Sequence, residues 1–449
     1  MRSFLLVCLM ILGFFARAQE APTGKTFQFN LQQCLEYAYA NNDSLKNARL
    51  DIESANYKVK ETIGLGLPQI SGNATFQDYF KVPESLIDVS NFNPTIPKGT
   101  VYQKVQFGVK YSTNASISVD QLIFNGSYLV GLQASKTYKE LSARMFNRSK
   151  IQTEIAVTKA YYQVLVNGEQ LRLLDANLSQ LKKQLTETAE LNKQGFVEKI
   201  DLDRVKVANN NLSTTRENTI RLLALGVELL KFQIGMPISN NLVIADKIEN
   251  VSLNIDTKIV SDSLAYKNRI EYSLLETQKK LNVLNLKRIK STALPSLSAF
   301  GSVATAYQNE KFSQLYDISL PFSFVGLRLN VPLFSGFQRL NQTRQAKIEV
   351  LKSENILHAV KNGLQLQQES SRIMFTNGLE SLKNQKENMG LAQEVLRVSR
   401  IKYEQGVGSS IEVTQAQTAL EQSENNYIQA LYNALISKVD LDHAYGRIQ

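Results

Sequence analysis

The chain has 449 residues, a formal net charge of +10 and two cysteines. This length could hold two or three ordinary domains. The lysine and arginine residues are dispersed rather than clustered, so the positive charge indicates a solvated surface and argues against a nucleic-acid-binding protein.

Residues 1–18 have the pattern of a secretory signal peptide. Arg2 precedes an apolar run over 4–15, and residues 16–18 form the small-x-small cleavage site Ala-Arg-Ala. The apolar run is too short to span a membrane as a helix. Loss of Arg2 and Arg17 with the signal reduces the net charge from +10 to +8. We expect an exported protein; the alternative is a buried N-terminal helix.

The cysteines exclude an intramolecular disulfide. Cys8 lies inside the signal, which leaves Cys34 alone in the mature chain. Cys34 occupies an apolar helical position, which favours a small core residue over a reactive thiol. No later segment has 18 or more consecutive apolar residues, so the sequence predicts no transmembrane helix.

The mature chain is an internal duplication. Four pairs of motifs match between its halves, with offsets of 227, 210, 211 and 211 residues: Leu67-Pro68 with Leu294-Pro295, Phe124-Asn125-Gly126 with Phe334-Ser335-Gly336, Gln194-Gly195 with Gln405-Gly406, and Ile234-Gly235 with Tyr445-Gly446. A repeat this long predicts two copies of one large unit. We place the first repeat at 19–235, a linker at 236–262 and the second repeat at 263–449.

Each repeat is predicted to begin with a helix that a Leu-Pro pair ends. In the first repeat this helix runs from Leu31 to Ile63, and two strands follow, at 69–80 and 107–124, with a Pro-containing loop at 81–106. In the second repeat the helix spans 264–289, and the strands are at 295–307 and 321–334. The drop in motif offset from 227 to 210 corresponds to 17 more residues in the strand region of the first repeat than in that of the second.

The strands alternate between apolar and polar residues. In 107–124, for example, Ile117 and Val119 face one way while Ser116 and Ser118 face the other. Alternating strands of about 10 residues are typical of a transmembrane barrel. A single strand of this kind would fit a soluble sandwich equally well. Four such strands in two matched pairs favour the barrel.

Long helices follow each pair of strands. We predict helices at 126–194 and 336–405, each followed, after a glycine turn, by a return helix, at 197–234 and 409–445. The leucines at 171, 174, 178, 181 and 185 are spaced as in a coiled-coil seam. At ~1.5 Å per residue, each long helix would extend about 100 Å. The narrow apolar seams and abundant polar residues predict helix pairs that expose two faces to water.

Four strands cannot close a barrel alone, since single-chain barrels need about 8. An open sheet in lipid leaves unsatisfied backbone groups at its edges. Three chains would supply twelve strands, and their helices could pool into a tube. The sequence has no phosphate loop and no H-E-x-x-H motif, and His358 and His443 stand singly on helices. We therefore expect a conduit without metal or cofactor, and no enzyme.

From Leu31 to Gly446 the chain resembles the TolC family of outer-membrane efflux proteins. The resemblance rests on these motifs: Leu31-x-x-Cys34-Leu35-x-x-Ala38-x-x-Asn41-Asn42, Asn268-Arg269-Ile270-Glu271, Leu67-Pro68-Gln69-Ile70-Ser71, Leu294-Pro295-Ser296-Leu297-Ser298, the run from Val325 to Gly336, and Ile411-Glu412-Val413 with Ala416.

This resemblance implies a mixed α and β membrane protein of the outer membrane with a large periplasmic part. Its homotrimer would form a 12-stranded barrel continuous with a periplasmic helical tube. The tube would meet a periplasmic adaptor and an inner-membrane pump and act as a passive duct for efflux or type I secretion. The alternative is a periplasmic coiled-coil scaffold or adaptor, which explains the helices but not the strands.

The resemblance also implies a gate at the tip turns, Gly195 and Gly406. The family's inter-helix bond between a Tyr and an Asp falls on Tyr403 and Asp201. Taken singly, both would be ordinary surface residues. The family's companion Arg position is Gly408, so the second link is missing. Of the family's acidic ring, Glu412 keeps a carboxylate and Gln415 does not, which implies a weaker cation-selective ring.

Overall fold

A computed structural model describes residues 25–88, 95, 97–99, 101–248, 251 and 265–448. The predicted signal peptide and residues 249–250 and 252–262 of the predicted linker lie outside this part. The chain divides into two compact units. Unit 1 comprises the described residues up to Ile52, Ser142–Glu276 and those from Ile356 onward, and unit 2 comprises Glu53–Leu141 and Thr277–Asn355.

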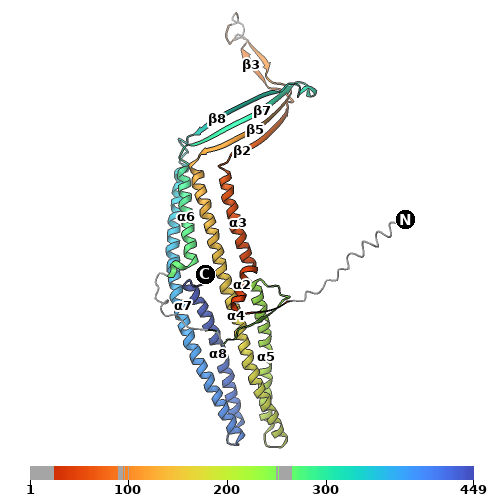
Figure 1. Ribbon diagram of the computed structural model, residues 1–449, viewed down its shortest axis with the longest axis vertical. Coiled ribbons are helices and arrows are strands. Elements are labelled where there is room, and N and C mark those ends of the chain that lie inside the picture. Colours follow the sequence, from red (N-terminus) through yellow and green to blue (C-terminus); the bar gives the residue numbers. More distant parts are fainter. Residues whose placement is uncertain are drawn as a thin grey trace, which may run out of the picture. The chain divides into compact units, whose positions relative to one another are not determined.

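Helices and strands follow the repeat (Figure 1). The helices are α2 (Leu31–Asn41), α3 (Asp43–Gly64), α4 (Gly126–Lys193), α5 (Lys199–Ile234), α6 (Ile270–Ser291), α7 (Gln338–Glu404) and α8 (Ser410–Ala444), with short 3-10 turns η3 (Ala265–Asn268) and η4 (Phe312–Gln314). The strands are β1 (Thr26–Phe29), β2 (Gln69–Asp78), β3 (Glu84–Asp88), β4 (Tyr102–Gln106), β5 (Tyr111–Phe124), β6 (Asn241–Ile244), β7 (Ser296–Asn309) and β8 (Leu320–Asn330). None of the described helices is both long and apolar enough to cross a membrane.

Unit 2 is built on an antiparallel sheet of order β2-β5-β7-β8, in which the inner strands come from different repeats (Figure 1). The register sets Asp120 opposite both Gln69 and Phe300, and Phe300 opposite Gly326. Because side chains alternate along a strand, one face carries the apolar residues. These apolar side chains are largely exposed: Val303 is 67% and Val325 91% accessible.

Three predictions for the first repeat were wrong. The helix expected from Leu31 to Ile63 is divided at Asn42, whose side chain accepts a hydrogen bond from Ser44 N at 2.9 Å and begins α3. Such an Asn competes with the helical backbone for hydrogen bonds. The loop expected at 81–106 contains the hairpin of β3 and β4, which pair antiparallel. Prolines around these short strands hid them in the sequence. Gly108, at φ +124°, separates the hairpin from β5, which begins at Tyr111 rather than 107.

The core of unit 1 packs α2 against α4 and α5. Cys34 and Tyr161 are fully buried there, together with Leu230 of α5. Burial, with the nearby charge of Asp246, raises the pKa of Cys34 to about 12, so this thiol is not reactive. Asp246 accepts hydrogen bonds from Leu31 N at 3.2 Å and from the Tyr161 hydroxyl at 2.7 Å, which anchors the start of α2.

Beside this core, β1 pairs in parallel with β6. The sequence analysis did not predict these two strands, since each has only four residues.

Each helical hairpin closes along its own apolar seam. In α4, Leu174, Leu178 and Leu181 are buried against Val205 and Leu212 of α5. Leu396 of α7 is likewise buried with Val413, Ala416 and Leu420 of α8. Full burial of one such leucine contributes roughly 1.5–3 kcal/mol. These seams hold the two turns that join the helices of each pair in place.

Candidate functional site

Both tip turns have the same backbone geometry. Gly195 and Gly406 adopt the left-handed conformation, with φ +79° and +71°. In each turn the next residue donates back across the helix end: Phe196 N to Leu191 O and Val407 N to Lys402 O, both at 3.0 Å. This is the Schellman arrangement, in which glycine avoids the steric cost of positive φ. The same bonding occurs at Gly235 and Gly446, where the return helices end.

The chain re-enters its return helix differently in the two turns. In the second turn, the Ser409 hydroxyl accepts a hydrogen bond from Glu412 N at 3.3 Å and caps α8. In the first turn, Glu198 precedes α5 without a side-chain cap, and Asn192 Nδ2 donates instead to Val197 O at 2.7 Å. The repeated backbone is therefore stabilised by different side chains.

Gly408 lies against the end of α7. A Cβ at this position would come within 2.9 Å of Lys402 Cβ and 3.0 Å of Tyr403 N. Contacts this close to main-chain atoms cannot be relieved by a side-chain rotation. At position 408, where the family resemblance implied an Arg, this turn therefore has room only for glycine.

Asp201 and Tyr403 lie near one another but are not hydrogen-bonded to one another in the described part of the chain. Burial, and then the charge of Asp201, raises the pKa of the half-buried Tyr403. The Asp201 carboxylate instead pairs with Arg204, whose Nη1 is 3.1 Å from Asp201 Oδ1. Asp201 therefore has a local partner one helical turn away that the sequence analysis did not identify.

Glu412 is exposed in the first turn of α8. Among the described residues its carboxylate makes no hydrogen bond or ion pair, and Gln415 is exposed on the same helix. A carboxylate near a helix N-terminus is favoured by the helix dipole. The structure thus leaves Glu412 available for solvent ions.

Sequence reasoning missed a polar pair at the tip, formed by Arg400 of α7 and Gln180 of α4. Arg400 and Gln184 line a groove of about 1020 Å³ that also includes Tyr403 and Gly408. Arg400 Nη1 is 3.4 Å from Gln180 Oε1, whereas its Nε and Nη2 are buried without a hydrogen bond in the described structure, as is Gln184 Oε1. Arg400 precedes Tyr403 by three residues and so shares its helix face, a spacing that could have identified it.

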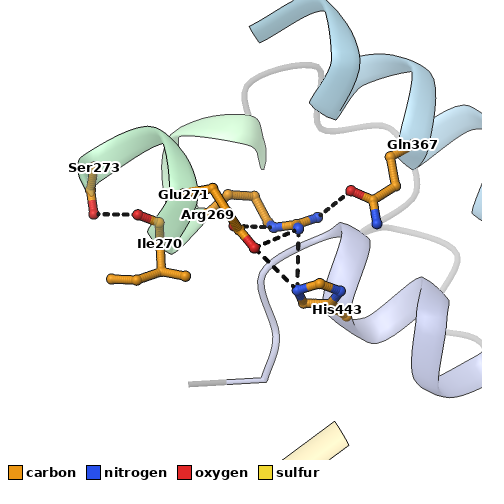
Figure 2. Close-up of polar contacts among 6 residues, drawn as sticks. All are labelled: Arg269, Ile270, Glu271, Ser273, Gln367 and His443. Atoms are coloured by element: carbon orange, nitrogen blue, oxygen red, sulfur yellow. Dashed lines mark hydrogen bonds and ion pairs between the residues drawn. The ribbon is translucent and has the colours of Figure 1, made fainter. Parts of the chain in front are cut away.

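A polar cluster joins α6, α7 and α8 at the C-terminal end of α8, away from its turn (Figure 2). Arg269 is 3% exposed, and its Nε and Nη2 donate to the two carboxylate oxygens of Glu271 at 3.1 and 3.2 Å. Its Nη1 donates to Gln367 Oε1 at 3.3 Å, and His443 Nε2 lies 3.2 Å from its Nη2. Burial alone would raise the pKa of Glu271, but the bonds from His443 and Arg269 outweigh it and lower that pKa.

The bidentate ion pair with Glu271 orients the guanidinium, and the contacts of Arg269 with Gln367 and His443 fix the start of α6 against α7 and the end of α8. It explains the Asn268-Arg269-Ile270-Glu271 motif as a structural element. No group of three His, Cys, Asp or Glu side chains within the described ranges could hold a metal ion.

Comparison with known proteins supports the family resemblance. Residues 285–447 match the family of outer membrane efflux proteins. Over 434 residues, 93% of this chain, the sequence is 22% identical to the outer membrane protein TolC of Salmonella enteritidis, of which it covers 82%. It is also 22% identical to the probable efflux pump outer membrane protein TtgC of Pseudomonas putida, with the same coverage. The family model and these relatives agree with the predicted resemblance to the TolC family.

Solved structures agree in fold. The transmembrane channel protein CusC superposes with a TM-score of 0.76 at 15% identity, over 96% of this chain and 95% of CusC. The open state of the MtrE outer membrane channel of Neisseria gonorrhoeae gives 0.73 at 16% identity, over 93% and 89%. The predicted TolC-family resemblance and the mixed α and β fold class are confirmed. The predicted outer-membrane exit duct agrees with these relatives, which are named as outer membrane efflux proteins and channels.

Proposed function

We propose that three copies of this outer membrane efflux protein close one 12-stranded barrel in the outer membrane. The observation that carries the proposal is the sheet of unit 2, which exposes apolar side chains on one face of all four strands. Its outer strands, β2 and β8, each have one neighbour within the described chain. In lipid an unpaired strand edge costs several kcal/mol per unsatisfied group, so further copies must cover both edges.

The polar face of the same sheet would then line the aqueous lumen. It carries Ser71 and Ser118, whose hydroxyls hydrogen-bond across the strands at 2.9 Å. The helical hairpins of unit 1 would form the periplasmic conduit, with narrow apolar seams and wet outer surfaces. A coiled-coil scaffold, the alternative from sequence, gives no role to the exposed apolar face of the sheet.

The tips would dock a periplasmic adaptor that connects the duct to an inner-membrane pump. Phe196 and Val407 occupy equivalent places directly after the two turn glycines and are 76% and 78% exposed. Exposed apolar side chains at the ends of polar helices favour a protein partner. The relative TtgC is described as part of an efflux pump, which supports the same kind of assembly for this chain.

The tip would also be the gate. Asp201, Tyr403 and Glu412 lie on helices that start or end at the turns, and Gly195 and Gly406 allow those turns. A Tyr–Asp hydrogen bond would hold the closed state if Asp201 exchanged Arg204 for Tyr403. Glu412, brought close to its two copies, would attract cations.

Two neighbouring residues on β7 provide a matched test of the barrel. Val303 and Ser302 point to opposite faces, the first apolar and the second polar. Val303→Arg should prevent insertion, since an arginine on the lipid face costs about 2–4 kcal/mol at mid-bilayer. Ser302→Arg should insert normally.

The measurements are chemical cross-linking and conductance in planar bilayers. We expect trimers and stable channels for the wild type and for Ser302→Arg, and neither for Val303→Arg. Equal insertion of both variants would contradict the assignment of faces, and a monomer without conductance would contradict the duct.

A further inference from the structure

Phe300 on β7 lies across the backbone of Gly326 on β8, its partner in the strand register. A Cβ at position 326 would come within 2.7 Å of Phe300 Cζ, so glycine alone leaves room for the ring. Phe324, two residues earlier on β8, meets the same ring edge-on with centroids 6.0 Å apart. The ring therefore has a fixed place on the face of the sheet that carries Ser298 and Ser302.

Arg328 covers the same ring from the other side of Gly326. Its Cζ lies 4.7 Å from the Phe300 centroid, within the range of a cation–π contact. Among the described residues, the guanidinium makes no ion pair or hydrogen bond, and the residue is exposed. A guanidinium has five N–H donors in a planar fork. These donors are fixed in direction by the stacking and are left free for a ligand.

Few charges compete with Arg328 on this face. Within the four strands, Asp120 and Arg328 are the charged residues that the register places on the face of Phe300. Asp120 lies opposite Phe300 on β5, whereas Arg328 lies on β8, so β7 and the ring separate the two charges. The structure has no ion pair between them, within its described part, that would neutralise the guanidinium.

A purely structural role accounts for only part of this arrangement. An aromatic ring that covers a strand glycine stabilises a sheet by itself. This stabilisation by the ring requires no cation over it, and it does not require the neighbouring aromatic rings to be exposed. Phe322 and Phe324, on the same face, are 53% and 49% exposed. The stacking restricts the arginine side chain before any ligand arrives, so less side-chain entropy is lost when the guanidinium binds one.

We propose that Arg328, held on the Phe300 ring, is a specificity-determining contact for cargo that carries a carboxylate on an apolar body. The inference rests on the proposed function, which places the polar face of the sheet on the lumen. The planar fork of Arg328 matches a carboxylate with two parallel hydrogen bonds. The exposed rings of Phe322 and Phe324 offer the apolar surface on which the rest of such a molecule can lie.

The test uses 1-naphthoate as the probe and the neutral 1-naphthalenemethanol as its control. Block of the open channel in planar bilayers gives a half-blocking concentration for each. Arg328→Gln should raise that of naphthoate about 5-fold, as expected for loss of a charge-assisted bond at an exposed site. Phe300→Leu keeps the charge but removes the support, and should shift the value in the same direction.

Matched controls separate position from net charge. Arg288→Gln removes an equally exposed arginine on α6, whose guanidinium contacts only Asn285 within the described residues, and should leave the half-blocking concentration unchanged. Equal half-blocking concentrations of naphthoate for the wild type and Arg328→Gln would overturn the inference. So would equal half-blocking concentrations of naphthoate and the neutral alcohol for the wild type.

A second measurement does not depend on channel formation. If the purified protein gave no conductance, the proposed function would fail on its own evidence. Calorimetric titration of naphthoate into the protein in a nonionic detergent, with empty micelles as the blank, would then decide the inference. Binding to the wild type that is lost in Arg328→Gln supports it. No binding to the wild type, or equal binding to the wild type and the variant, overturns it.

Discussion

Asn177 on α4 donates a hydrogen bond from its Nδ2 to the carboxylate of Glu424 on α8, and both side chains are buried. Burial is the largest cause that raises the pKa of Glu424, to about 7, and the charge of Glu421 adds to it. The hydrogen bond from Asn177 and the charge of Arg172 act in the opposite direction. The contact between the two hairpins thus contains an acid that prefers to be neutral.

This acid predicts a stability that falls with rising pH. The pKa of Glu424 is raised in the folded chain from 4.5 to about 7. Its contribution to the free energy of unfolding is therefore complete below pH 4.5 and lost as pH rises through 7. A shift of this size corresponds to on the order of 3 kcal/mol. Glu424→Gln should remove the pH dependence and, at pH 8, melt a few degrees above wild type.

Thermal unfolding of the detergent-purified protein at pH 5 and pH 8 provides the check. Glu387→Gln, which neutralises an exposed carboxylate on α7, serves as the control and should melt like the wild type at both values. Parallel pH profiles for wild type and Glu424→Gln would show that Glu424 is already ionised in the bundle.

The turn between α7 and α8 should tolerate no side chain at 408. Gly408→Ala places a Cβ within 3.0 Å of Tyr403 N, and we expect a loss of about 1–3 kcal/mol from this overpacking. Gly390→Ala, inside α7 with open space around it, should instead stabilise by up to about 1 kcal/mol. Thermal unfolding measures both. A neutral Gly408→Ala would mean that the turn relaxes without cost.

The gate should depend on the competition between Arg204 and Tyr403 for Asp201. One hydrogen bond is worth about 0.5–1.5 kcal/mol, so Tyr403→Phe with Asp201→Ala should raise the open population about 2- to 10-fold. Arg204→Gln frees Asp201 for Tyr403 and should lower it. Single-channel recordings and uptake of large antibiotics report the change. If the double variant and Arg204→Gln both matched the wild type, neither Asp201 nor Tyr403 would belong to the gate.

Glu412 should set ion preference at the mouth. Glu412→Gln removes a carboxylate that has no partner among the described residues, so the reversal potential should shift toward anions and block by divalent cations should weaken. Gln415→Glu restores a second carboxylate on the same helix and should shift it the other way. A reversal potential that neither variant alters would place Glu412 away from the lumen.

Sequence periodicity was sufficient for the long elements. The leucine spacing that predicted a seam corresponds to residues buried between α4 and α5, such as Leu174 and Leu178. The alternation of apolar and polar residues predicted which side chains share a face of the sheet, because side chains alternate between the two faces along each strand. The short parallel pair β1 and β6 could not be predicted, since four residues carry no usable period and their partners are more than 200 residues apart.

The tip could be predicted only in part. The turns at Gly195 and Gly406 could be predicted, because a turn that needs positive φ favours glycine. The Asp201–Arg204 pair and the unsatisfied Arg400 were not, since which of several nearby polar groups bond depends on packing within tenths of an ångström. Arg328 was evident as a polar residue in its strand, but its stacking required the cross-strand register to place Phe300 beside it.

The two tip turns are closed by main-chain hydrogen bonds that any residue after the glycine, except proline, can donate. Phe196 and Val407 can therefore be exchanged without opening the hairpins. Natural variation at these positions is free to change the recognition of partners while the scaffold persists. The apolar surface at each tip can thereby change while the turn beneath it keeps its geometry.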